Sequence, residues 1–179
     1  MNRIISVLLA MLSVVLVSAQ ESKLVNLQTE VRFDYQREYL NGDAVKSNSG
    51  FKGKYLNVIL NGSFNEHFSY SYRQRLNKAH ADQSFFDATD WIYLTYKLNK
   101  NWSFAGGKQV VGIGGYEYDR APIDLYFCSE YWNNIPCYQF GVSTTYTTNS
   151  GKDSFMAQFC ESPFNFRNED LYAYNLMWY

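Results

Sequence analysis

Two arginines placed two residues apart are the strongest candidates for chemistry in this sequence. Arg73 and Arg75 lie in a polar stretch, and residues i and i+2 of an extended strand point to the same side. Guanidinium groups on one face attract anions, above all along a water-filled passage with low-dielectric walls. Further bases are expected on the same kind of face, namely Arg32, Lys97 and Lys108. Alternatively, these bases pair with Glu30, Asp34 and Asp90 on neighbouring strands as an interior charge network.

Material for catalysis or metal binding is sparse. The chain has two histidines, His67 and His80, and neither a Cys-x-x-Cys pair nor a G-x-S-x-G elbow. The glycine-rich stretch 112–115 lacks the strand-loop-helix context of a nucleotide-binding loop. We therefore expect neither an enzyme nor a bound cofactor or metal. Three cysteines make a poor disulfide framework, although Cys128 and Cys137 flank a loop and could pair, which the sequence leaves open.

Composition favours β structure. The 179 residues include 16 Tyr and 13 Phe, and aromatic residues make up 18% of the chain, as many as the charged ones. Such a composition suits strands and argues against disorder and against a helical bundle. The formal net charge of -1 gives no indication of nucleic-acid binding.

The first nineteen residues have the form of a secretory signal peptide. Arg3 precedes an apolar run at 4–17, and the small residues Ser18 and Ala19 provide a cleavage site. A transmembrane helix is the alternative, but the run is shorter than the roughly 20 residues that a helix needs to span a bilayer. We expect residues 1–19 to be removed and residues 20–179 to form one exported domain.

The elements that must position the arginines are strands, because apolar and polar residues alternate with a period of two. From Val25 to Tyr35 the odd positions are mostly apolar and the even ones polar, over more residues than a soluble strand usually has. The pattern recurs and predicts eight strands, at about 25–35, 55–64, 68–75, 91–98, 102–111, 138–147, 154–160 and 172–178.

Links between these strands alternate in length. Short turns follow the second, fourth and sixth strands, whereas long links are expected at about 40–49, 77–85, 112–135 and 161–171. An even number of strands with short turns at one rim and long loops at the other is typical of an all-β, transmembrane, antiparallel up-and-down β-barrel in the outer membrane of a Gram-negative bacterium. Outer-membrane lipid is then the first partner, and aromatic residues at strand ends, as at Trp91, Trp102, Tyr138 and Trp178, would form the interfacial girdles.

The alternative is a secreted β-sandwich or a lipocalin-like binding module, which turns its apolar face inward. The two architectures differ in where particular side chains lie. A membrane barrel places Val31, Phe33, Leu94 and Phe140 outward and Arg32, Arg73 and Lys97 inward. Burial of those four apolar residues in one central core would contradict the barrel.

Short motifs give nearly the whole mature chain a resemblance to a known family. The stretch WIYLTYKLNKNWSFAGGKQ at 91–109, the glycine-rich bend that follows it, YQFGV at 138–142 and YNLMWY at 174–179 resemble the amino-terminal half of outer-membrane porins of the phosphate-selective O/P type, as found in Bacteroidetes. The resemblance implies passive diffusion of small hydrophilic solutes, including anions such as phosphate, through trimeric barrels of about sixteen strands.

Eight strands are half of such a barrel, and about eight strands enclose an interior just filled by side chains. Two explanations follow. The chain is the amino-terminal part of a longer porin, or it is a small closed eight-stranded barrel with a structural or adhesion role. The resemblance favours the first.

By the same resemblance, the link at 112–135 would fold into the lumen as a constriction loop; an ordinary external loop is the alternative. Four of its five charged residues are acidic, which departs from the sign expected for a phosphate-selective pore. The five are Glu117, Asp119, Arg120, Asp124 and Glu130.

Overall fold

The computed structural model describes residues 24–78, 84–114, 117, 125, 128–165 and 170–179. The expected signal peptide at 1–19 and His80 lie outside the described residues. Among the residues that are described, no helix has both the length and the apolar character needed to cross a membrane.

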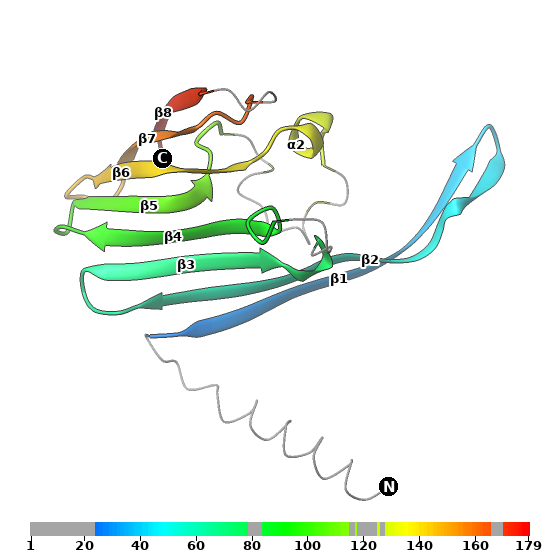
Figure 1. Cartoon of the computed structure of the whole chain (residues 1–179), viewed down its shortest axis with the longest axis horizontal. Helices are drawn as coiled ribbons and strands as arrows, with labels where there is room; N and C mark the ends of the chain where they lie inside the picture. Colours follow the sequence, from blue (N-terminus) through cyan, green and yellow to red (C-terminus); the bar gives the residue numbers. More distant parts are fainter. Residues whose placement is uncertain (1–23, 79–83, 115–116, 118–124, 126–127, 166–169) are drawn as a thin grey trace, which may run out of the picture.

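Eight strands form one antiparallel sheet in the order of the chain, which confirms the all-β, up-and-down architecture (Figure 1). The outermost strands of this order, β1 and β8, have no ladder with each other in the described sheet. The strands are β1 (Asn26–Leu40), β2 (Asp43–Ser63), β3 (Phe68–Arg75), β4 (Thr89–Lys97), β5 (Trp102–Val110), β6 (Tyr138–Thr147), β7 (Ser154–Glu161) and β8 (Tyr172–Trp178). Two short helices accompany them, η1 (Leu76–Lys78) and α2 (Glu130–Asn134).

The predicted long link at 40–49 is wrong. A two-residue turn at Asn41 and Gly42 joins β1 to β2, with φ of 53° and 94°. Positive φ at both central residues is the requirement of a type I′ turn, whose twist matches that of the flanking strands, so an Asn-Gly pair closes a tight hairpin. The two strands consequently continue as a hairpin arm beyond the rest of the sheet (Figure 1).

Two of the short turns share one device built on asparagine. The Asn65 side-chain oxygen accepts hydrogen bonds from the backbone N–H groups of His67 and Phe68, at 2.9 and 2.8 Å. The Asn99 oxygen accepts in the same way from Asn101 and Trp102, at 2.9 Å each. Asparagine favours such turns because its side chain replaces a backbone acceptor, which explains why the turns after β2 and β4 are short.

The apolar face of the sheet looks outward, as predicted. Phe33 is 78% exposed, and Val31, Leu94 and Phe140 are also exposed. Arg73, in contrast, is 7% exposed on the opposite, inner face. A soluble sandwich would have to bury the apolar row, whereas a barrel in lipid leaves it at the surface.

Trp102 and Trp178 lie on the outer face next to aromatic partners, with ring centroids 4.9 Å from Tyr146 and 6.4 Å from Phe155. The girdle prediction is wrong for Trp91, which belongs to the inner face. The register pairs it with Arg73, and its indole N–H donates to the Ser71 hydroxyl at 2.8 Å.

Candidate functional site

The inner face of β3 and the start of β4 carry a buried charge cluster. The Arg73 Nε lies 2.8 Å from Asp90 Oδ2, and the Arg75 Nε lies 2.6 Å from Asp90 Oδ1. The side chains of Arg73, Arg75 and Asp90 are 9%, 13% and 6% exposed, respectively. Since one carboxylate serves two guanidinium groups, the trio retains a net charge of about +1 at neutral pH.

A β-bulge brings Asp90 between the arginines. The register of β3 with β4 passes from Arg73 opposite Trp91 to Gln74 opposite Thr89, which leaves Asp90 as the extra residue. A bulge bends its strand and changes the direction of a side chain. The position of Asp90 therefore depends on an irregularity of pairing.

Aromatic rings support the same cluster. The Arg73 guanidinium lies 4.8 Å from the ring centroid of Trp91, and that of Arg75 lies 5.9 Å from the ring of Tyr138. These two rings are themselves 5.9 Å apart. A cation over an aromatic face is attracted by the ring quadrupole, so the rings hold the guanidinium groups without neutralising them. Tyr138, which we had expected in a girdle, belongs to this cluster.

A third cation stands close by. Lys78 ends η1, directly after β3. Lys78 follows Arg75 by three residues, and desolvation and then the positive charge of Arg75 lower the pKa of Lys78.

On the inner face of β1, one base, Arg32, accompanies two acids, Glu30 and Asp34. Arg32 Nε donates to Asp34 Oδ1 at 3.0 Å, and Glu30 accepts a hydrogen bond of 2.9 Å from the side chain of the fully buried Asn57. The network alternative is thus correct for Arg73 and Arg75, which pair with Asp90 of the neighbouring strand although they outnumber it, whereas Arg32 pairs within its own strand. We call these six residues the charged wall, which comprises Glu30, Arg32, Asp34, Arg73, Arg75 and Asp90.

The described parts of the 112–135 link contact the inner face near both outer strands of the sheet order, at β7 and at β1. The Gly112 N–H donates to Gln158 of β7 at 2.8 Å. Leu125 accepts a 2.6 Å hydrogen bond at its carbonyl from Arg32 of β1, and Cys128 and Tyr55 of β2 line a common cavity of about 190 Å³. Gly112, Leu125 and Cys128, which are described parts of the link, therefore lie against the inner face.

The two acidic residues of the link that the structure describes, Glu117 and Glu130, accept hydrogen bonds from within the link. Glu117 accepts hydrogen bonds from the backbone N–H and the hydroxyl of Ser129, at 2.6 and 2.5 Å, and Ser129 in turn caps α2. Glu130 accepts from the Asn134 side chain at 3.2 Å. Asp119, Arg120 and Asp124 lie outside the described residues.

No disulfide bond joins Cys128 to Cys137 in the structure, which resolves the pairing that the sequence left open. Burial, and next the negative charge of Glu117, raise the pKa of the Cys128 thiol. Among the described residues, no group of three or more His, Cys, Asp and Glu side chains could hold a metal ion.

The remaining two predicted bases lie elsewhere. Lys97 is directly opposite Ser103 and so shares the inner face, but it ends β4 at the exposed short-turn rim, away from the cluster. Lys108 was predicted to line the inner face, and this prediction is wrong. The ladder sets it between Ile92 and Phe140, both on the outer face, and residues directly opposite each other share a face. Its ammonium group donates to the carbonyls of Phe86 and Thr89, at 2.6 and 2.8 Å.

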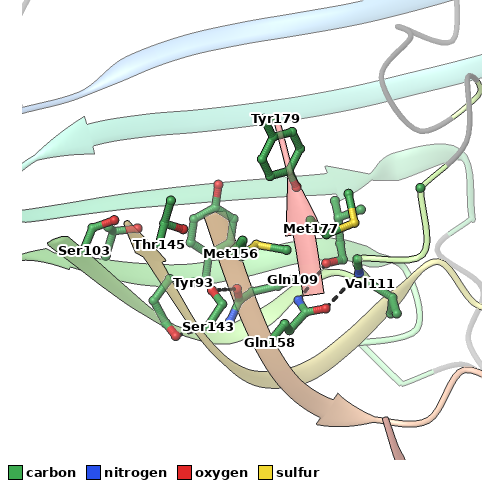
Figure 2. A pocket seen from close by; sticks show the side chains of 15 residues that line it. Tyr93, Ser103, Gln109, Val111, Ser143, Thr145, Met156, Gln158, Met177 and Tyr179 are labelled. Atoms are coloured by element: carbon green, nitrogen blue, oxygen red, sulfur yellow. Dashed lines mark hydrogen bonds between the residues drawn. The ribbon is translucent and has the colours of Figure 1, made fainter. Parts of the chain in front are cut away.

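Sequence reasoning missed a part of the inner face of β4–β8 that is polar but carries no charged side chain. A cavity of about 380 Å³ lies there (Figure 2). None of the side chains that line it is a Lys, Arg, Asp, Glu or His. The residues we call the neutral wall are Tyr93, Thr95, Ser103, Gln109, Ser143, Thr145 and Gln158. Glutamine at positions 109 and 158, on the polar faces of otherwise apolar strands, was the available signal.

An uninterrupted antiparallel sheet with an apolar outer face and a polar, charged inner face defines the class of outer-membrane β-barrel proteins. Within that class, the family model for phosphate-selective porin O and P matches residues 25–178, and the chain belongs to this family. Membership implies an outer-membrane location and indicates a channel protein rather than an enzyme. No curated protein and no solved structure matches the chain.

Proposed function

We propose that the chain is part of a porin through which small hydrophilic solutes diffuse passively, with a preference for anions such as phosphate. The observation that carries the anion preference is the shared carboxylate of Asp90, which leaves Arg73 and Arg75 with a net positive charge on the inner face. Lys78 adds a further positive charge nearby.

The 112–135 link would narrow the passage. Support comes from its contacts with Gln158 on β7 and with Arg32 on β1, which are separated by most of the sheet. Glu117 and Glu130 accept hydrogen bonds from neutral groups inside the link, which fixes the positions of their carboxylates.

We further propose that the domain belongs to a wider barrel, of about sixteen strands and assembled as a homotrimer, in a bacterium of the Bacteroidetes. Support comes from the family match and from the sheet order, in which β1 and β8 do not pair with each other, whereas a small closed barrel requires that pairing. Export would rely on removal of residues 1–19.

Reversal potentials in planar bilayers test the anion preference. Arg75→Gln removes one positive charge while leaving Arg73 to pair with Asp90, so the variant should fold. We expect the preference for chloride and phosphate over potassium to fall about fivefold, as for the loss of roughly 1 kcal/mol of attraction. Lys97→Gln, at the exposed rim, is the matched control and should change the ratio little. Equal ratios in Arg75→Gln and the unmodified protein would refute the role of the cluster.

A further inference from the structure

The neutral wall combines hydroxyl groups with an apolar surface in one cavity. Six hydroxyl side chains line it, and four of them make no side-chain hydrogen bond within the part of the chain that the structure describes. These four are Tyr93 and Thr95 of β4, Ser103 of β5 and Thr145 of β6. The register sets Ser103 opposite Thr145 and places Thr95 in the next row, opposite Ala105. Figure 2 shows Tyr93, Ser103 and Thr145 around the same space.

The two glutamines of the wall serve as its scaffold. Gln158 accepts from the Gly112 N–H at 2.8 Å and donates to the Val110 carbonyl at 2.9 Å. Gln109 accepts from the Ser143 hydroxyl at 2.7 Å. Because these amides are occupied, the hydroxyls named above are the groups that remain to bind a solute.

The apolar part of the cavity comes from the last two strands and from the start of the 112–135 link. Met156 and Met177 are directly opposite each other on β7 and β8, and the fully buried Val111 lies beside them on the cavity lining. Methionine offers a polarizable surface that adapts to irregular shapes.

We propose that this cavity is a binding site for a neutral, hydroxyl-rich solute of monosaccharide size. The proposal rests on the porin function proposed above. A sugar presents hydroxyl groups at its edge and C–H groups on its faces, which matches a wall of hydroxyls next to methionine and tyrosine. An anion that left water for this cavity would meet no charged lining group to compensate its desolvation, in contrast to the Arg73 and Arg75 cluster. The volume is at the lower end of the roughly 300–1,000 Å³ of small-molecule sites.

Glucose is the probe, and the full-length exported protein is studied in two ways. Conductance is recorded in planar bilayers while glucose is added, and the glucose concentration that halves the blockable current is determined. Independently, saturation-transfer NMR detects contact between glucose and the protein, solubilised in a detergent without a sugar headgroup. The first measurement requires a working channel, and the second does not.

The variant Tyr93→Phe/Thr145→Val removes two cavity hydroxyls with little change in shape. We expect its half-blocking concentration to rise about tenfold, as for the loss of two hydrogen bonds, and its NMR signal to fall in parallel. The matched control is Tyr96→Phe/Thr144→Val, which makes the same changes at neighbouring positions on the other face of β4 and β6. The control should behave as the unmodified protein.

Glucose contact without channel conductance would support the site and refute the porin function. Conductance without glucose contact would overturn the site and leave the porin function intact. Equal half-blocking concentrations in the cavity variant and the control would also overturn it. If inorganic phosphate displaced glucose competitively, the assignment to neutral solutes would be wrong.

Discussion

The charged wall and the neutral wall belong to the same face of one sheet, yet they satisfy their polar groups in different ways. The charged wall has three bases and three acids, but Arg73 and Arg75 share one carboxylate and lie against aromatic rings, so the positive charge is concentrated on β3. In the neutral wall, the uncharged amides of Gln109 and Gln158 make hydrogen bonds with the backbone and with a hydroxyl, so its polar groups are satisfied without any ion pair. The net charge of -1 for the whole chain does not reveal this difference between the two walls. The electrostatic field near a solute depends on which charged groups lie close to it and how they are paired.

The largest effect is expected from the centre of the charged wall. Asp90→Asn leaves the buried guanidinium groups of Arg73 and Arg75 without a counter-charge, and removal of one member of a buried ion pair costs about 3–5 kcal/mol. Urea unfolding in detergent should show a lower midpoint, and heat-modifiable migration should weaken. Asp34→Asn is the comparison. It removes the counter-charge of one arginine, Arg32, and should destabilise the protein less. If both variants were equally stable, the shared carboxylate would not be the centre of the cluster.

A smaller loss is expected from the neutral wall. Gln158→Leu deprives the Gly112 N–H, the Val110 carbonyl and the Asn175 amide of their partner. Unsatisfied buried groups cost about 1–3 kcal/mol, and we expect about 2 kcal/mol in the free energy of unfolding, below the effect of Asp90→Asn. Gln139→Leu is the matched control, since Gln139 makes no side-chain hydrogen bond within the described residues. A larger loss in Gln158→Leu than in Asp90→Asn would reverse the comparison.

The smallest effect concerns pH. Lys78 has a lowered pKa and therefore loses its proton at a lower pH than the ordinary lysine value of 10.5. As the pH rises towards 10.5, Lys78 should lose its proton before an ordinary lysine does, so the positive charge near Arg75 should fall and the anion preference should decline with it. Lys78→Met should start from a weaker preference and lack this early decline, as reversal potentials at increasing pH would show. The same decline in Lys78→Met would assign it to another group.

The alternation of side chains predicted most of the fold. The bounds of β3, β6 and β8 agree with the residues expected from the sequence, and Phe33 and Leu94 face outward as their positions required. The hairpin arm was missed because its Asn-Gly turn lies in a polar stretch that resembles a loop.

The site was harder to predict. Arg73 and Arg75 were recognised from their spacing, and Asp90 was named as a partner for the bases. Nothing local revealed that Asp90 occupies a bulge or that it contacts both arginines. Lys108 was assigned to the wrong face because Gly106 and Gly107 interrupt the pattern of β5, and only the ladder to Ile92 and Phe140 fixes it.

The amino-acid sequence by itself determined which side chains share a face, since successive residues of any strand point to opposite sides and hydrophobicity then selects the side that meets lipid. Only the tertiary structure decided which inner residues meet. The hydrogen bond from Arg32 to Leu125 joins residues 93 positions apart, and the cavity draws on five strands and the start of a link. Such contacts depend on strand register, on one bulge and on the path of the 112–135 link, which are set by packing across the whole sheet and not by any short stretch of sequence.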